Sequence, residues 1–184
     1  MKEKVIFIPG FTGSKSDTLL LKSILKDQEV VYFDYETMLN ESISTLAKKL
    51  DRFIKKNDYT KVTLIGMSTG GIIANYYLKF IDRSRTKKLV TICSPFQGSY
   101  LARMFFRKKK GLADLRPGSG VLTRLQDAKT KGVRTLNIYS YFDFMVPGNS
   151  AKGEKPAHTL FFLHPFIQFY PPILFKIRRF LSND

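Results

Sequence analysis

The fold class of this chain is decided by the segment Gly66-Met67-Ser68-Thr69-Gly70-Gly71. It follows Lys61-Val62-Thr63-Leu64-Ile65, an apolar run rich in β-branched residues that is typical of a buried strand. It precedes Ile72-Ile73-Ala74-Asn75-Tyr76-Tyr77-Leu78, which is typical of a helix. Glycines let the end of a strand and the start of a helix approach closely, because they carry no side chain. The sequence therefore predicts a strand, a sharp turn and a helix in succession, with Ser68 on the turn.

Strands and helices alternate in the same way along the rest of the chain. Apolar runs at 5–8, 30–33, 62–65, 89–93, 135–139 and 159–163 predict six strands. Helices are predicted at 17–26, 43–54, 69–82 and 121–131 and from Pro172 onward, with Asn40 as the N-cap of the second. Strands that are apolar throughout and alternate with helices favour a parallel sheet covered on both faces. We therefore predict an α/β three-layer sandwich, with about six mostly parallel strands, in one domain spanning residues 1–184.

The composition is that of an ordinary globular protein, with 43% hydrophobic and 25% charged residues. The first residues lack the apolar run of a signal peptide or a membrane span, and the one cysteine, Cys93, cannot form an internal disulfide. We therefore expect a cytoplasmic protein with Cys93 in its core. The formal net charge of +16 favours an anionic membrane surface, nucleic acid or acidic ligands as partners, while a general bias toward lysine explains it as well. No zinc-finger spacing or RNA-binding aromatic motif is present, so no nucleic-acid partner is expected.

Ser68 has the surroundings of an activated hydroxyl. A serine between small residues on a strand-to-helix turn is held clear of the sheet, and the helix N-terminus favours negative charge that develops nearby. The simpler alternative is a glycine-rich turn with a capping serine. The pattern predicts a nucleophile at Ser68.

A second glycine-rich turn, Ile8-Pro9-Gly10-Phe11-Thr12-Gly13-Ser14, follows the first predicted strand. It can aim a backbone N–H at the point reached by the N–H of Thr69. Two such donors form an oxyanion hole, in which each donor typically contributes ~10²–10³ in rate. A phosphate-binding loop is the rival interpretation, but the turn lacks the lysine of a P-loop and does not complete the glycine pattern of a dinucleotide site.

A serine nucleophile needs a base, and the chain has two histidines, His158 and His164. His164 directly follows the predicted strand 159–163, whereas His158 precedes that strand and would lie at its wrong end. Asp143 follows the strand before it, in the chain order of serine, acid and histidine. A capping or packing role for His164 and a turn or N-cap role for Asp143 are the alternatives.

Together with Ser94-Pro95-Phe96-Gln97-Gly98-Ser99 and Asp143-Phe144-Met145-Val146-Pro147, these segments resemble the α/β-hydrolase superfamily. The chain is most similar to small bacterial triacylglycerol lipases and esterases with a minimal core. The resemblance implies Ser68, Asp143 and His164 as a catalytic triad, with Phe11 and Thr69 as the oxyanion-hole donors. It implies cleavage of small-molecule or lipid esters through an acyl-enzyme, without a metal or organic cofactor. A thioesterase or acyltransferase with the same triad and a non-catalytic module that binds membrane surfaces are the alternatives.

The segment at about 99–118 combines apolar and basic side chains between two predicted strands. On a helix, Leu101, Met104 and Phe105 share one side, and the cations of 107–110 follow them. Such an element at the rim of the site predicts a lid or an anchor on an anionic membrane. Packing of its apolar side on the sheet is the alternative.

Overall fold

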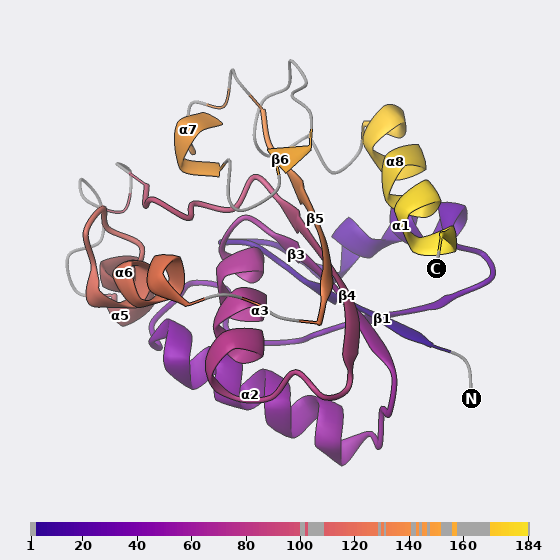
Figure 1. Ribbon diagram of the computed structural model, residues 1–184, viewed down its shortest axis with the longest axis horizontal. Helices are drawn as coiled ribbons and strands as arrows, with labels where there is room; N and C mark the ends of the chain where they lie inside the picture. The colour runs from indigo at the N-terminus through magenta and orange to yellow at the C-terminus, as the bar shows by residue number, and fades with distance from the viewer. Residues whose placement is uncertain are drawn as a thin grey trace.

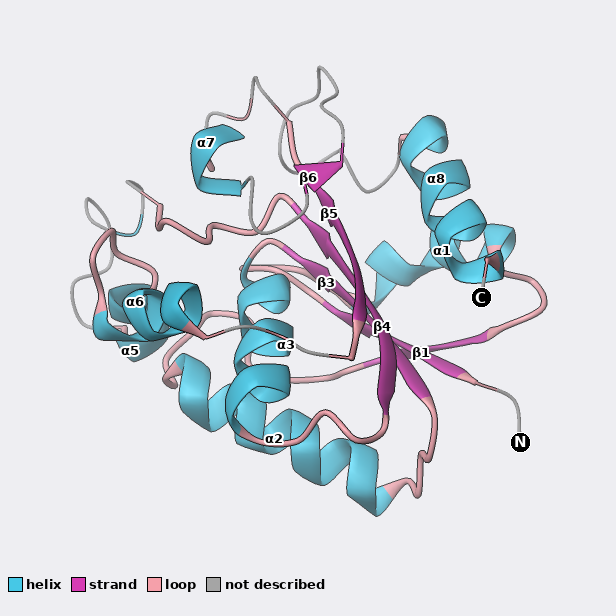
Figure 2. Ribbon diagram, in the orientation of Figure 1, coloured by secondary structure: helices cyan, strands magenta, loops and turns pink. Residues whose placement is uncertain are grey.

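The computed structural model describes residues 3–99, 102, 109–128, 130, 132–140, 143, 145–146, 148–151, 156–157 and 170–183. Within them, a six-stranded sheet has helices on both faces (Figures 1 and 2). The strands are β1 (Lys4–Ile8), β2 (Glu29–Tyr32), β3 (Val62–Met67), β4 (Thr86–Ile92), β5 (Arg134–Ile138) and β6 (Pro156–Ala157). Their order is β2-β1-β3-β4-β5-β6, and every neighbouring pair is parallel. The predicted fold class is confirmed.

Alternate residues of the strands support helices on opposite faces of the sheet. The helices are the 3-10 helix η1 (Lys15–Thr18), α1 (Leu19–Ile24), α2 (Ile43–Lys56), α3 (Thr69–Phe80), α5 (Lys110–Asp114), α6 (Gly120–Asp127), α7 (Gly148–Ala151) and α8 (Pro171–Ser182). Ile6 and Ile8 of β1 pack in one core with α2 and α3, whereas Val5 and Phe7 pack in the other with α1 and α8. Figure 1 shows α1 and α8 together on one side of the sheet, with α2 and α3 on the other. All five predicted helices are present.

The N-cap of α2 is Ser42, so the prediction of Asn40 is wrong. Ser42 Oγ accepts a hydrogen bond from the Thr45 N–H at 3.2 Å, which satisfies one of the donors that a helix leaves unpaired at its start. Asn40 lies two residues too early, and its own N–H donates to Glu36 Oε2 at 2.9 Å. A carboxylate oxygen of Asp114 accepts from the Ile43 N–H at 2.8 Å and completes the cap.

The described part of the sixth strand comes just before the predicted run 159–163 in sequence. β6 pairs Pro156 and Ala157 with Asn137 and Ile138 of β5. The predicted strand 159–163 lies outside the described residues. His158 and His164 also lie outside the described residues, so the strand-position argument that favours His164 over His158 stays a prediction.

The segment 99–118 is described only in part: Leu101, Met104, Phe105 and the cations at 107 and 108 lie outside the described residues. From 109 on, the chain packs on the protein. The Lys109 ammonium donates to the Met38 carbonyl at 2.9 Å, and Leu112 is buried in the core that α2 and α3 share. These contacts fix the end of the segment, and the lid or anchor stays a prediction. Within the described part of the chain, no helix combines the length and apolarity that a membrane crossing requires.

Candidate active site

Ser68 occupies the turn between β3 and α3 in a strained conformation. Its φ is 49° and its ψ is −118°, a region that residues with a side chain seldom adopt. Such a residue costs about 1–3 kcal/mol and persists only where its surroundings hold it. Here the Ser68 N–H donates to the Ile92 carbonyl at 2.7 Å, and the Ser68 carbonyl accepts from the Gly71 N–H at 3.1 Å. The residue is only partly buried.

The glycines around Ser68 are required by close backbone contacts. A Cβ on Gly66 would lie 2.4 Å from the Gly71 nitrogen, where β3 meets the first turn of α3. A Cβ on Gly70 would lie 2.1 Å from the Ile8 carbonyl oxygen, where α3 meets the end of β1. Both separations are far below contact distance, so any larger residue would push α3 away from the sheet.

The loop after β1 lies against Ser68. A Cβ on Gly10 would be 3.0 Å from the Cβ of Ser68, and the Gly13 N–H donates to the Gly10 carbonyl at 3.1 Å, which closes a tight turn. Half-buried Phe11 packs on the α2–α3 core, with the Lys109 ammonium 5.7 Å from its ring centroid. Phe11 and Thr69 therefore lie on the two segments that meet at Ser68.

Asp143 is a buried carboxylate beyond the end of β5, with 5% of its surface exposed. Its Oδ1 accepts hydrogen bonds from the Met145 and Val146 N–H groups, both at 2.9 Å, so its own loop fixes its orientation. The Cys93 N–H donates to the Ile138 carbonyl at 2.8 Å, as the Ser68 N–H does to Ile92. These bonds join the ends of β3, β4 and β5. Ser68 and Asp143 consequently lie at the carboxyl edge of the sheet, where parallel α/β sheets bind their ligands.

Comparison with known proteins gives structural relatives only: no protein-family model and no curated protein matches the chain. MGS-MChE2, an α/β-hydrolase enzyme from the metagenome of Mar Chica lagoon sediments in Morocco, superposes with a TM-score of 0.69 at 19% identity, covering 98% of this chain and 90% of that one. The chain has the α/β-hydrolase fold. The mature lipase BlEst2 of Bacillus licheniformis superposes with a TM-score of 0.72 at 15% identity, covering 96% and 91% of the two chains. Phospholipase PlaB of Legionella pneumophila superposes with a TM-score of 0.65 at 17% identity. The match covers 76% of this chain but only 39% of PlaB.

The base of the predicted triad cannot be located on this α/β-hydrolase fold, because His164 lies outside the described residues, as His158 does. Among the described residues, the Gly10 turn packs on Ser68, and Asp143 lies at the same edge of the sheet, beyond the end of β5. Among the described residues, no three His, Cys, Asp or Glu side chains cluster in a way that could hold a metal ion.

Two residues that sequence reasoning did not connect with the site support it. Cys93 is buried, as expected, but it lies beside the acid. Burial raises the pKa of the Cys93 thiol well above its usual value, and the charge of Asp143 and a hydrogen bond to its carboxylate raise it further. The neutral thiol is therefore a hydrogen-bond donor to Asp143.

The second is Tyr35, whose hydroxyl donates to the Pro9 carbonyl at 2.8 Å and so holds the turn that lies on Ser68. Burial raises the pKa of Tyr35 far above its usual value, which keeps the hydroxyl protonated. Cys93 is the last residue of the predicted strand 89–93, and its place at a strand end was a signal for the site. No pattern in the sequence singled out Tyr35.

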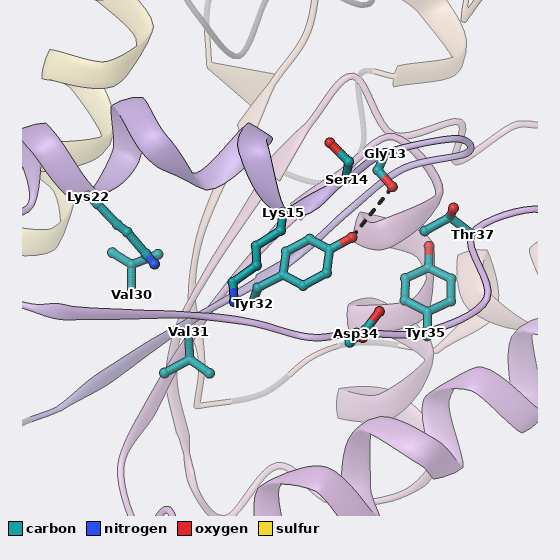
Figure 3. Close-up of a pocket in the computed structure, with 10 residues that line it drawn as sticks. All are labelled: Gly13, Ser14, Lys15, Lys22, Val30, Val31, Tyr32, Asp34, Tyr35 and Thr37. Atoms are coloured by element: carbon teal, nitrogen blue, oxygen red, sulfur yellow. Dashed lines mark hydrogen bonds between the residues drawn. The ribbon is translucent and has the colours of Figure 1, made fainter.

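A cavity of about 600 Å³ lies beside this region, between η1, α1 and β2 (Figure 3). Its lining includes Lys15, Lys22 and Asp34, and the Tyr32 hydroxyl donates across it to the Gly13 carbonyl at 3.4 Å. The cavity shares Gly13 with the turn after β1 but is not lined by Ser68. It is thus a neighbour of the candidate active site and separate from it.

Proposed function

We propose that this protein is a serine hydrolase that cleaves carboxylic esters, with Ser68 as the nucleophile, His164 as the base and Asp143 as the base's orienting carboxylate. The observation that carries the proposal is the conformation of Ser68: a partly buried serine at φ 49° on the turn from β3 to α3, with the Gly10 turn packed on it. Backbone strain of this kind is concentrated at functional sites. A serine with a purely capping role has no need of it.

The reaction follows from the roles proposed for these groups. His164 takes the Ser68 Oγ proton while Oγ bonds to the ester carbonyl carbon, and the electron pair of the C=O bond moves to its oxygen. The N–H groups of Phe11 and Thr69 stabilise that oxyanion. When the carbonyl re-forms, the alcohol leaves with the proton from His164. Water then attacks the acyl-enzyme by the same route, releasing the acid and free Ser68. This chemistry needs no metal or organic cofactor.

Asp143 suits the role of the orienting carboxylate. It is buried, its loop fixes Oδ1 through two backbone donors, and it lies at the same sheet edge as Ser68. A buried carboxylate orients a histidine and stabilises the imidazolium that forms during attack. The descriptions of BlEst2 as a lipase and of PlaB as a phospholipase support an ester, and within esters a lipid, as the substrate class.

Labelling with a fluorophosphonate probe tests the proposal directly. The wild-type protein should be labelled and should hydrolyse a short-chain p-nitrophenyl ester. The Ser68→Ala variant should not be labelled, and its kcat should be lower by a factor of about 10⁴–10⁶. Ser84→Ala, a change at an exposed serine that bonds Asp82, is the matched control and should behave as wild type. If Ser68→Ala kept more than about a tenth of the turnover, the assignment of the nucleophile would be wrong.

The leaving group is tested separately, with an oxygen ester and a thioester of the same acyl chain. The proposal expects a higher kcat/KM for the oxygen ester. A clear preference for the thioester would overturn the substrate class and leave the role of Ser68 intact.

A further inference from the structure

Large apolar side chains are exposed to solvent on α1 and α8. Leu19 is 65% exposed and Leu20 39% exposed on α1, and Phe175 is 60% exposed on α8. Both helices bury their inner sides, including Leu21 and Ile177, in the core on their face of the sheet. The three exposed side chains are therefore not needed to fill that core, and they are available for contact with a partner.

The topology brings these side chains to the edge of the sheet that carries Ser68. A helix that follows a parallel strand begins at the carboxyl edge and runs back toward the amino edge. α1 follows β1, and α8 ends at the amino edge, where Lys88 of β4 donates to the Leu181 carbonyl at 2.7 Å; the two helices contact each other (Figure 1). Leu19 and Leu20 begin α1, and Phe175 lies in the first half of α8, behind exposed Pro171. The apolar residues thus lie at the carboxyl-edge ends of both helices.

Cations follow the apolar residues on the same two helices. Lys22 and Lys26 are exposed on α1 and the turn after it, and Arg178 and Arg179 are exposed in the second half of α8. Among the described residues of α1, α8 and the turn after α1, Asp27 is the one exposed acidic residue. The α1–α8 surface, defined as Leu19, Leu20, Phe175 and these four cations, is therefore apolar toward the site and positive behind it.

We propose that the α1–α8 surface docks on a membrane that contains anionic phospholipid. Apolar side chains beside basic ones are the pattern of an element that lies in a membrane interface. Leu19, Leu20 and Phe175 insert between the lipids, and the cations behind them lie at the level of the phosphates. This orientation turns the carboxyl edge of the sheet, and Ser68 with it, toward the lipid. The inference takes its substrate class from the proposed function, but the binding itself does not depend on that function.

The surface differs from the one that the sequence suggested. The sequence alone predicts membrane contact at the basic tract 107–110. Within that tract, Lys109 donates a hydrogen bond to the Met38 carbonyl, and its ammonium lies over the Phe11 ring. The cations of α1 and α8 lie instead on the opposite face of the sheet from α2. This separation provides a matched control for the experiment.

The experiment measures sedimentation of the full chain with vesicles of phosphatidylcholine, with and without phosphatidylglycerol, at two salt concentrations. The first variant replaces the apolar residues (Leu19→Ser, Leu20→Ser, Phe175→Ser) and the second the cations (Lys22→Gln, Lys26→Gln, Arg178→Gln, Arg179→Gln). The control removes the same charge from exposed residues of α2 and the turn after α3 (Lys48→Gln, Arg52→Gln, Lys56→Gln, Arg83→Gln). Thermal melting verifies that all three are folded.

The wild-type protein should sediment with the anionic vesicles and much less with the neutral ones. One cation near an anionic leaflet strengthens partitioning onto the membrane about fivefold. The second variant should therefore bind the anionic vesicles at least about tenfold more weakly than the wild-type protein. The apolar variant should lose a similar factor. The control should bind nearly as wild type, because salt screens charges on the far face over a Debye length of about 10 Å at 0.1 M ionic strength.

Three outcomes would overturn the proposal: unchanged binding by both variants, an equal loss in the control, or a loss in the cation variant alone. The last would point to a polyanion such as nucleic acid, for which the apolar residues are not needed. Hydrolysis of a soluble short-chain ester is measured in parallel and should be the same in all variants. If no ester is hydrolysed but binding follows the expected pattern, the proposed function fails and the docking surface stands.

Discussion

The strain at Ser68 predicts an unusual order of stability between two inactive variants. Ser68→Ala and Ser68→Gly both remove the hydroxyl, but only glycine adopts φ 49° and ψ −118° without steric strain. Relative to the alanine variant, relief of the strain stabilises the folded glycine variant by about 1–3 kcal/mol. The greater conformational entropy of glycine in the unfolded chain offsets about 0.5–1 kcal/mol of this gain. We therefore expect Ser68→Gly to be more stable than Ser68→Ala by about 1 kcal/mol. For a domain of this size, that difference raises Tm by about 2–4 °C.

The assay is thermal and urea unfolding of the two variants, with loss of ester hydrolysis measured on the same samples. Ala74→Gly, inside α3, is the control for an ordinary helical position. There glycine should be the less stable residue by about 1 kcal/mol, so the sign of the effect is opposite at the two sites. If Ser68→Gly were less stable than Ser68→Ala, the turn would not be strained, and the argument from strain to function would lose its basis.

Three further predictions concern the other members of the site. His164→Ala should reduce kcat on a short-chain ester nearly to the level of Ser68→Ala, while His158→Ala keeps most of it; the reverse result would make His158 the base. Asp143→Asn should lower kcat by about 10⁴, because an amide favours the wrong tautomer of the base, and wild-type turnover would rule out the triad. Iodoacetamide at about pH 8 should spare Cys93 in the folded protein and alkylate it in urea, since burial keeps the thiol protonated and shielded; mass spectrometry detects the adduct.

The parts of the fold that follow from short stretches of sequence could be predicted. Apolar runs and helical spacing found the first five strands and the main helices, because each pattern is contained in one element. The turn at Ser68 could be predicted for the same reason, since Gly66 and Gly70 are its neighbours in sequence. The parallel arrangement then implied that the ends of β3 and β5 share one edge, which is where Ser68 and Asp143 lie.

The parts that depend on contacts between distant segments could not be predicted in this way. Asn40 and Ser42 are both good capping residues, and the choice depends on Glu36, which binds the Asn40 N–H in the preceding turn. The hydrogen bond from Tyr35 to Pro9 spans 26 residues and exists only because β2 and β1 are neighbours in the sheet. The contact of Cys93 with Asp143 likewise needs β4 beside β5. A sequence pattern shows which residues share a helix face, but not which strands are neighbours in the sheet.

The border of the sheet at β2 has a consequence for how the protein behaves at high concentration. β2 has four residues and begins with exposed Glu29, which forms an ion pair with Lys4 of β1. An outer strand exposes backbone donors and acceptors that can recruit another copy of the chain, and short length and charge are the usual defences against this. The net charge of +16 adds repulsion between copies. Growth of the sheet into fibrils through this border is therefore disfavoured, and most strongly at low salt, where the repulsion extends furthest.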